Sequence, residues 1–302
     1  MAYYLIAGAS GYVGSRLAAR LLSQGHRVRG LVRNPESDLV EDLAARGMSV
    51  WTGDLTQADT LIGVADGIDY VLNVTSRLAI ESGSVRRTFV DGNQNLIAAC
   101  SRSRSVRSYT FTSNVAAYGD AGDALIDEDA PVRPICALGS VMAEAEQTII
   151  AAARNHRFPA IILRVAAIYG PERDPLAAIE DGPLTIYGDG RNFVSHIHVD
   201  DLVEILARVA TDGQPGAIYN VGDNDPVRLY DLVAEVRRRL GMVPPRTFSP
   251  AVALQSGLDH SVVAMLTASV RLSNARLLHD LGVALRFPSY FVWLDERLAF
   301  GV

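Results

Sequence analysis

Short apolar runs alternate with longer amphipathic stretches through the first half of the chain. The apolar runs are typical of buried strands, and the predicted strands are Tyr3–Ala7, Arg27–Val32, Ser49–Thr52, Tyr70–Asn73, Ser108–Thr112 and Ala160–Leu163. Between them apolar residues recur at helical spacing, and the predicted helices are Tyr12–Gln24, Leu39–Arg46, Val85–Ser101 and Leu138–Asn155. Strands and helices that alternate in this way predict an α/β fold with a doubly wound parallel sheet.

The pattern loosens after Gly170-Pro171, where several prolines and glycines interrupt any long element. The elements predicted beyond this point are a helix opening at Asp200-Asp201, a strand over Ala217–Val221, and helices near Leu229–Leu240 and Asn274–Leu281. We therefore expect residues 1–170, with the returning strand at 217–221, to form one domain. Residues 171–302 are expected to form a smaller cap built from discontinuous segments.

The composition is that of an ordinary globular protein, with 302 residues of which 49% are hydrophobic and 21% charged. The formal net charge of −6 argues against nucleic acid or an anionic membrane as a partner, because either would require a basic face. No apolar run has the length of a membrane span, and the N-terminus passes directly into a predicted strand, which leaves no room for a signal peptide. The sequence therefore predicts a cytoplasmic protein.

Lysine does not occur in the sequence, so all 28 basic residues are arginine. Any mechanism that requires lysine is thereby excluded, including Schiff bases, the phosphate-loop lysine and a tyrosine–lysine proton donor. Cys100 and Cys136 are the two cysteines, which are too few for a disulfide framework or a thiolate metal cage. By default both are small buried hydrophobic residues.

A glycine-rich loop joins the first predicted strand to the first predicted helix. Gly8 allows a tight turn, Gly11 lets the backbone approach a pyrophosphate, and Gly14 permits close packing of the helix on the strand. A bound anion would sit on the free amides at the helix start. The loop therefore predicts a Rossmann sheet that binds a dinucleotide through Gly8, Ser10, Gly11, Tyr12, Val13 and Gly14. The alternative is a glycine-rich turn that binds nothing.

The end of the second predicted strand bears on which dinucleotide binds. It carries Arg33, and no carboxylate stands where an NAD enzyme would bind the ribose 2′-hydroxyl. Because a guanidinium can pair bidentately with a 2′-phosphate, the sequence favours NADP(H) over NAD(H). The alternative for Arg33 is a solvated surface residue. Asp54 and Leu55 follow the third strand and are expected to border the adenine ring, although Asp54 could equally cap the next helix.

Several short motifs, in their order and spacing, resemble those of one enzyme family over nearly the whole chain. They are the Gly8–Gly14 loop, Gly53-Asp54-Leu55, Gly92-Asn93-Gln94-Asn95-Leu96, Thr112-Ser113 through Tyr118-Gly119-Asp120, Arg164 through Tyr169-Gly170-Pro171, and His198-Val199-Asp200-Asp201-Leu202. The chain thus resembles an extended or atypical short-chain dehydrogenase/reductase of the NAD-dependent epimerase/dehydratase superfamily. The resemblance implies a Rossmann fold and an enzyme that oxidises, reduces, epimerises or dehydrates hydroxyl and carbonyl substrates, often nucleotide sugars.

The catalytic residues of that family are missing at the matching positions. Family members use a Ser or Thr after the fifth strand and a Tyr-x-x-x-Lys on the next long helix, where the lysine lowers the tyrosine pKa. The preferred register places Asn114 at the Ser/Thr position, Leu138 at the tyrosine and Met142 at the lysine. A register shifted by two residues places Cys136 and Ser140 there instead. In neither register does the resemblance carry over the proton relay.

The resemblance also implies which residues surround the nicotinamide and the substrate. On the cofactor side they are Asn73, Thr75, Val165 and Ala166. On the substrate side they are Ser76, Phe89, Tyr118, Leu138 and Arg191, the last being a surface ion-pair residue in the alternative interpretation. Phe89 stands where many relatives carry asparagine, and Leu138 and Met142 are apolar as well. We therefore expect a pocket more hydrophobic than that of a nucleotide-sugar enzyme, and a lipophilic or aromatic small-molecule substrate.

Candidates to replace the missing catalytic groups are Ser113, Asn114, Cys136 and His196. Asn114 could orient a carbonyl or stabilise an oxyanion, or it could be a structural amide, but it cannot titrate. Ser113 has no identifiable base, and Cys136 either faces the pocket mouth or is buried and inert. His196 shares one face of an extended segment with His198 and is titratable. Because no further ligands cluster with these histidines, no metal site is predicted.

Three functions remain open from the sequence. The first is NADP(H)-dependent redox chemistry on a small lipophilic carbonyl or hydroxyl compound, with an unusual proton source such as water, a substrate hydroxyl or His196. The second is a non-redox cyclisation, dehydration or isomerisation on the same scaffold. The third is a non-catalytic protein that senses the dinucleotide. Many relatives pair through two long helices, here Val85–Ser101 and Leu138–Asn155, so a homodimer is a further expectation.

Overall fold

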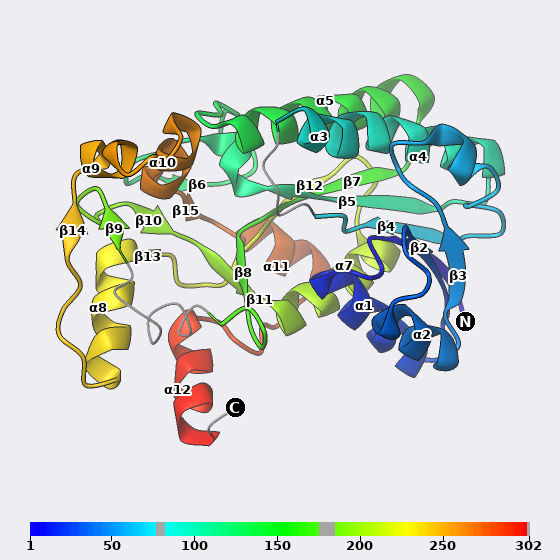
Figure 1. Cartoon of the computed structure of the whole chain (residues 1–302). Coiled ribbons are helices and arrows are strands. Elements are labelled where there is room, and N and C mark those ends of the chain that lie inside the picture. The colour runs from blue at the N-terminus through cyan, green and yellow to red at the C-terminus, as the bar shows by residue number, and fades with distance from the viewer. Residues whose placement is uncertain (77–81, 175–184, 301–302) are drawn as a thin grey trace.

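The computed structural model describes residues 1–76, 82–174 and 185–300. At the centre of this part of the chain lies a parallel sheet of seven strands in the order β12-β7-β5-β4-β1-β2-β3 (Figure 1). The strands are β1 Tyr3–Ala7, β2 Arg27–Val32, β3 Ser49–Thr52, β4 Tyr70–Asn73, β5 Ser108–Asn114, β7 Ala160–Val165 and β12 Ile218–Val221. The strand order reverses beside β1, which is where ligands bind in sheets of this kind. The predicted doubly wound parallel sheet is confirmed.

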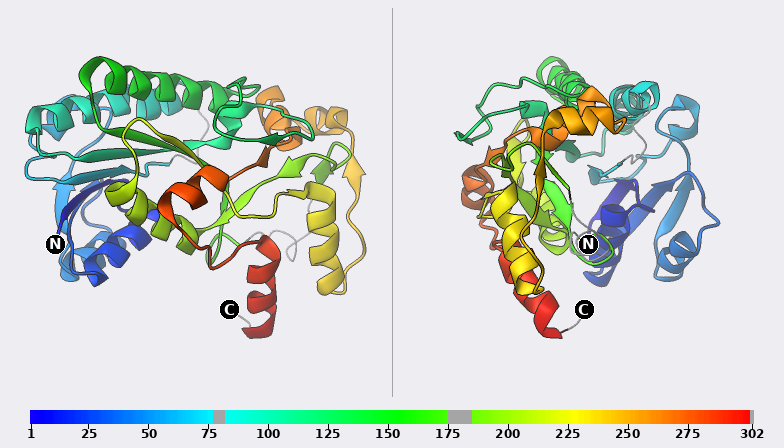
Figure 2. Two further views of the ribbon diagram at one scale, coloured as in Figure 1. Left: turned by 180° about the vertical axis from the view of Figure 1, so that it is seen from behind. Right: turned by 60° about the vertical axis from the view of Figure 1, so that its left-hand side comes forward.

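Helices cover both faces of the sheet (Figures 1 and 2). On one face lie α4 Gly92–Ser103 and α5 Ala137–His156, and on the other lie α1 Tyr12–Ser23, α2 Asp38–Ala45, α7 Val199–Asp212 and α11 Ala275–Leu281. Successive side chains of a strand point to opposite faces, so Leu5 belongs to one core and Ile6 to the other. This explains why β1 is apolar at every position instead of alternating.

Shorter elements extend beyond the central sheet. They are the strand pairs β6 Leu125–Ile126 with β15 Arg271–Leu272, β8 Ala167–Tyr169 with β11 His196–His198, β9 Ile186–Tyr187 with β14 Thr247–Phe248, and β10 Phe193–Val194 with β13 Val227–Arg228, and the helices α8 Leu229–Arg239, α9 Pro250–Gln255, α10 His260–Thr267 and α12 Tyr290–Phe300. A separate core of aromatic and aliphatic side chains joins part of this region. The expected division near residue 170 stays a prediction. Although they come after residue 170 in the chain, β12 belongs to the central sheet, and α7 and α11 pack on it.

One predicted helix is interrupted. The expected helix Val85–Ser101 consists of α3 Ser82–Arg86, a π-helical turn at Arg87–Asp91 and then α4. A π turn inserts one extra residue into a helix. The apolar pattern on either side of it stays close to helical periodicity, so the sequence does not reveal the turn. The two-residue strands were also not predicted, because periodicity cannot be recognised over two positions.

An ion pair between Arg164 on β7 and Glu146 on α5 lies inside the core. Nη2 of Arg164 is 2.8 Å from Oε2 of Glu146, and both side chains are buried. The hydroxyl of Ser113 on β5 donates to the same carboxylate at 2.5 Å. Nη1 of Arg164 donates to the hydroxyl of Tyr118 at 2.8 Å, and that hydroxyl donates to Oδ1 of Asn220 on β12 at 2.7 Å. The network therefore ties α5 to three neighbouring strands.

Two further expectations concern the surroundings of the protein. Within the described ranges, no helix has both the length and the apolar character needed to cross a bilayer. The helices α4 and α5 lie side by side on one face of the sheet (Figure 1), which is the surface where pairing of two copies is expected. That pairing and the cytoplasmic location both stay predictions.

Replacement of Glu146 by glutamine should destabilise the protein by about 3 to 5 kcal/mol, because Arg164 would be left as a buried charge without its counterion. The measurement is the free energy of unfolding from urea titration. Glu144→Gln on the same helix is the matched control, since Glu144 pairs with Arg86 at the surface and its loss should barely move the midpoint. Equal effects of the two variants would contradict the importance assigned to the buried pair.

Candidate active site

The glycine-rich loop between β1 and α1 has the geometry of a close backbone approach. Gly8 has a positive φ of 89°, which glycine adopts without strain. A Cβ atom on Gly14 would lie 2.0 Å from the carbonyl oxygen of Gly8, so any larger residue would push α1 away from the loop. The first amides of α1 have no partner within the helix and are available to an anion. The loop thus fits a pyrophosphate group.

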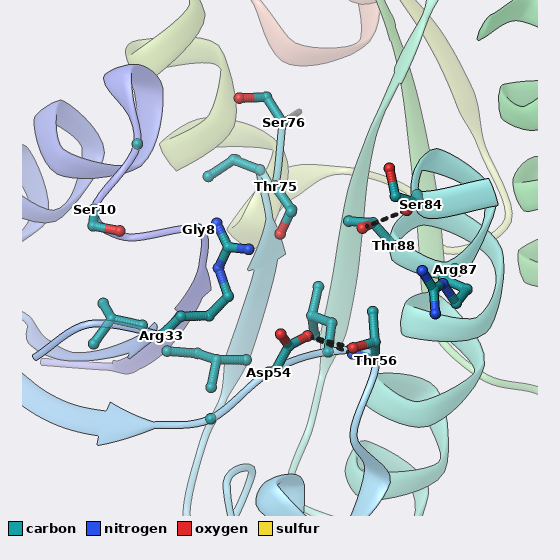
Figure 3. Close-up of a pocket in the computed structure, with 16 residues that line it drawn as sticks. Gly8, Ser10, Arg33, Asp54, Thr56, Thr75, Ser76, Ser84, Arg87 and Thr88 are labelled. Carbon is teal, nitrogen blue, oxygen red and sulfur yellow. Dashed lines mark hydrogen bonds between the residues drawn. The ribbon is translucent and has the colours of Figure 1, made fainter. Parts of the chain in front are cut away.

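A cleft of about 440 Å³ lies at this loop and is here called the glycine-loop cleft (Figure 3). Its lining residues are Gly8, Ser10, Gly11, Leu31, Val32, Arg33, Gly53, Asp54, Leu55, Thr56, Val74, Thr75, Ser76, Ser84, Arg87 and Thr88. Arg33 reaches across the cleft toward Thr75 (Figure 3). Arg33 and Arg87 are exposed, and neither has an ion-pair partner within residues 1–76, 82–174 and 185–300. The cleft therefore presents two free cations to a ligand.

Two polar residues expected beside the dinucleotide are held by the protein itself. Oδ1 of Asp54 accepts hydrogen bonds at 2.8 Å from both the amide and the hydroxyl of Thr56, so Asp54 lines the cleft and also organises the following turn. Asn73 is buried and lines none of the cavities described here. Its amide nitrogen donates to Asn93 at 3.0 Å and to Tyr109 at 3.3 Å. Asn73 thus fixes the end of β4 from within the core.

A second cavity of about 150 Å³, here called the inner pocket, lies beside the cleft. Its lining residues are Tyr12, Val13, Val74, Thr75, Ser76, Phe89, Thr112, Ser113, Asn114, Leu138, Met142, Val165, Ala166, Ile168, Arg173 and Leu202. Val74, Thr75 and Ser76 line both cavities, so the two adjoin each other. Oγ1 of Thr75 is buried and has no hydrogen-bond partner among the described residues, so a ligand atom at this junction would satisfy it.

A third cavity of about 260 Å³, here called the apolar chamber, adjoins the inner pocket. Its lining residues are Asn114, Val115, Ala116, Gly119, Ile135, Cys136, Leu138, Ala167, Phe193, Val194, Ser195, His196, Met265, Ala268 and Val270. Asn114 and Leu138 belong to both cavities and form their shared wall. No acidic residue or arginine of the described ranges lines this chamber. It is therefore suited to an uncharged ligand.

Ser113 and Asn114 are neighbours at the end of β5, yet their polar atoms are in different situations. The hydroxyl of Ser113 is committed to Glu146, as described above. Oδ1 of Asn114 accepts a hydrogen bond from the amide of Ala116 at 2.8 Å, which caps the short 3₁₀ turn that follows. The amide nitrogen of Asn114 has no partner in the part of the chain that the structure describes. Asn114 can therefore donate a hydrogen bond at the wall between the two cavities.

Cys136 and His196 both line the apolar chamber. Cys136 is buried and caps α5, with its sulfur accepting from the amide of Gly139 at 3.4 Å. Burial lowers the pKa of His196 to about 4, so its imidazole is neutral at pH 7. Both His196 and His198 contact the ring of Tyr169, with centroids 6.1 and 5.2 Å from it, as expected for residues on one face of β11. Nδ1 of His198 caps α7 through the amide of Asp200.

Two residues expected near the substrate lie elsewhere. Tyr118 is buried in the Arg164 network and lines none of the three cavities. Arg191 is exposed in a turn, where its amide donates to Oδ1 of Asp189 at 2.9 Å and its carbonyl accepts from Arg228. Phe89, Ser76, Leu138, Val165 and Ala166 do line the inner pocket. The expected apolar character of the pocket stays a prediction, because Thr112, Asn114 and Arg173 line it as well.

Some lining residues were missed by sequence reasoning. Arg87 enters the glycine-loop cleft from the π turn, and Arg173 reaches the inner pocket with its guanidinium 4.5 Å from the Tyr12 ring. Met265 and Val270 come to the chamber from a segment more than seventy residues after Phe193. Arg173 follows the Tyr169-Gly170-Pro171 motif closely enough to have been considered. No comparable signal marks the others.

Comparison with known proteins identifies the relationship that this architecture suggests. A model described as the NAD dependent epimerase/dehydratase family matches residues 4–222, which is well over half of the chain. This protein belongs to that family. A functionally unknown conserved protein from Silicibacter pomeroyi DSS has 30% sequence identity and a TM-score of 0.78, with 99% of both chains covered. The family resemblance predicted from the motifs is thereby confirmed.

Epimerase/dehydratase family members with named activities are more distant. The structure of DesIV, a dTDP-glucose 4,6-dehydratase from Streptomyces venezuelae with NAD and TYD bound, has a TM-score of 0.81 at 20% identity and covers 98% of this chain and 96% of that one. At this identity the likeness concerns the fold alone. A trifunctional UDP-glucose 4,6-dehydratase, epimerase and reductase from Arabidopsis thaliana is 25% identical over 265 residues. The match covers 80% of this chain but only 40% of the plant protein.

Replacement of His196 by glutamine should make the protein relatively more resistant to acid. The folded-state pKa of His196 lies below its unfolded value of 6.5, so the unfolded chain binds more protons between pH 6.5 and 4, and this residue costs stability as pH falls through that window. When the pH is lowered from 7.5 to 4.5, the free energy of unfolding of His196→Gln should rise by about 2 kcal/mol relative to that of the wild type. Urea unfolding at both pH values measures this, with exposed His260→Gln as control. A pH-independent difference would contradict the assigned burial.

Proposed function

We propose that the protein binds NADP(H) in the glycine-loop cleft and uses it to reduce or oxidise a small, mainly apolar carbonyl or hydroxyl compound held in the apolar chamber. The placement of the three cavities side by side carries the proposal. Thr75 and Ser76 lie between the cleft and the inner pocket, and Asn114 and Leu138 lie between the inner pocket and the chamber. Ligands bound at the two ends would therefore meet at a wall that contains one free hydrogen-bond donor.

The cofactor part of the proposal rests on the fit of the cleft. Gly8 and Gly14 allow the tight turn and the close packing of α1 that place its first amides at the cleft, and Thr75 has an unsatisfied buried hydroxyl at the junction with the inner pocket. Arg33 supports NADP(H), because its guanidinium is unpaired within the described residues and lies over the cleft (Figure 3). When bound, the reduced form supplies a hydride and the oxidised form accepts one.

The substrate part rests on the chemistry of the chamber walls. Some relatives are named for dTDP-glucose or UDP-glucose. Each of these compounds contains a diphosphate, and a diphosphate requires cationic partners. Arg228 and Arg271 stack on the ring of Phe193, but neither lines the chamber, and Arg228 already pairs with Asp123. An uncharged, mainly apolar ligand satisfies these walls better.

Asn114 would position the reacting oxygen in this arrangement. Its free amide nitrogen lies in the wall common to the inner pocket and the chamber, where it can donate a hydrogen bond to a carbonyl oxygen and stabilise negative charge that develops there. An amide cannot supply a proton, so the proton needed to complete a reduction must come from another group.

Replacement of Arg33 by glutamine should weaken NADPH binding by roughly 10- to 100-fold, which corresponds to loss of a charge-assisted pair with the 2′-phosphate. NADH affinity should change less than about twofold, because NADH has no such phosphate. Isothermal titration of both nucleotides gives the comparison. Arg46→Gln is the control, since Arg46 pairs with Asp42 on the surface of α2 outside the cleft. Equal weakening of both nucleotides would show that Arg33 does not read the phosphate.

With NADPH present, acetophenone should be reduced by the wild-type protein, whereas UDP-glucose should neither stabilise the protein nor affect the nicotinamide absorbance. Ala268→Phe fills the chamber and should abolish the ketone-dependent loss of NADPH while NADPH binding persists. Leu266→Phe, two residues away and exposed, should behave as the wild type. If UDP-glucose stabilises the protein against heat and apolar ketones cause no loss of NADPH, the proposed substrate class is wrong.

A further inference from the structure

A group of polar side chains is buried directly behind the apolar chamber, and the proposed reaction does not yet use it. His196 on β11 lines the chamber, and its ring lies 6.1 Å from that of Tyr169 on β8 and 5.7 Å from that of Tyr290 on α12. The rings of Tyr169 and Tyr290 are 4.9 Å apart. Asp223 follows β12, and its amide donates to the carbonyl of His196 at 2.6 Å. Four elements thus bring two phenols, an imidazole and a carboxyl together.

Each of these four side chains has a buried polar atom without a hydrogen-bond partner. The atoms are Nδ1 of His196, the hydroxyls of Tyr169 and Tyr290, and Oδ2 of Asp223. Nine such atoms occur in the described part of the chain, so almost half of them gather at this one place. Buried polar groups are normally satisfied, and a cluster of unsatisfied donors and acceptors that adjoin one another is where ordered water is found in proteins.

The protonation states of the group are complementary. Burial raises the pKa of Asp223 to about 8, so its carboxyl carries a proton at neutral pH. Burial raises the pKa of Tyr169 well above its usual range. His196 is neutral, as described above. The cluster thus contains a proton donor of moderate strength behind an imidazole that can accept at one nitrogen and donate at the other.

We propose that ordered water links Asp223, Tyr169, Tyr290 and His196 into one hydrogen-bonded network, and that this network delivers the proton to a carbonyl oxygen reduced in the apolar chamber. This inference rests on the proposed function. In this network His196 donates the proton directly to the substrate, and Asp223 supplies a proton to His196. The network stands in for the phenol that the family register would place at Leu138.

The step balances without any further reactant. With bound NADPH as the hydride source, the carbonyl oxygen would gain negative charge and would take the proton from Nε2 of His196. As Nε2 gives up that proton, Nδ1 would take one through water from the carboxyl of Asp223, so the imidazole stays neutral. The products are the alcohol, a neutral imidazole in the other tautomer and a carboxylate at Asp223, which is protonated again from solvent.

Other charged and titratable groups surround the network. They are His198 on β11, Asp201 on α7, Asp225 after Asp223, Asp174 after β8, Arg286 before α12 and Arg297 on α12. The carboxylate of Asp201 accepts hydrogen bonds from the amides of Arg286 and Phe287, and Arg297 pairs with Asp174 at 2.9 Å. Nε2 of His198 is a further buried atom without a partner beside this group, and Asp223 is the carboxyl with a buried oxygen left for the network.

Nitrogen-15 NMR of histidine-labelled protein tests the network without any turnover. His196→Gln assigns the signals of the ring. We expect the His196 ring to stay neutral down to about pH 5, and its Nδ1 resonance to shift in Asp223→Asn and in Tyr169→Phe. Asp295→Asn is the control, because it removes an exposed carboxylate on α12 that pairs with Arg239, and it should leave the ring unchanged. Spectra in which neither Asp223→Asn nor Tyr169→Phe moves the His196 signals would overturn the proposal.

Kinetics with acetophenone and NADPH test the proton delivery. His196→Gln should lower kcat by roughly 100-fold or more while NADPH affinity is retained. The wild-type rate of reduction should fall above about pH 8, where Asp223 loses its proton, and Asp223→Asn should be slower and lack this decline. A His196→Gln enzyme with nearly wild-type kcat would overturn the assignment. If the wild type binds NADPH but reduces no ketone, the proposed function fails, and the NMR result still decides whether the network exists.

Discussion

The buried ion pair between Glu146 and Arg164 is the interaction on which the rest of the site depends. It joins α5 to the central strands, and α5 begins at the point where Leu138 and Cys136 form walls of the inner pocket and the chamber. A buried ion pair is costly unless both partners and their remaining donors are satisfied, and here Ser113 and Tyr118 complete it. The middle of α5 is therefore tied to the sheet, and this positions the helix whose first turn carries walls of the site.

The same interaction explains how an epimerase/dehydratase scaffold can retain its cavities while its polar groups are redistributed. Ser113 is used by the ion pair, so the hydroxyl at the end of β5 serves the fold, whereas the neighbouring Asn114 keeps a free donor at the cavity wall. The titratable groups lie on the opposite side of the chamber, on β11 and after β12. Proton chemistry in this protein would approach the substrate from that side.

The central sheet and the glycine loop could be predicted because each depends on local sequence. Runs that are buried on both faces stand out as continuous apolar segments, and the loop glycines occur at fixed spacing. The chamber could not be predicted, because Phe193, Met265 and Val270 reach it through two-residue strands and short helices that carry no periodic signal. Asn73 was misleading for a different reason: a polar residue at a strand end suggests a ligand, but its partners Asn93 and Tyr109 lie in distant segments.

The position of β12 has a consequence for how the chain is made. This strand completes the sheet beside β7, with Ile218 opposite Ile162, yet it follows β7 by more than fifty residues. Until it has been synthesised, β7 is an open edge with unpaired backbone groups, and such edges promote aggregation. During synthesis the edge of β7 therefore stays without its partner strand until residues 218–221 have been made.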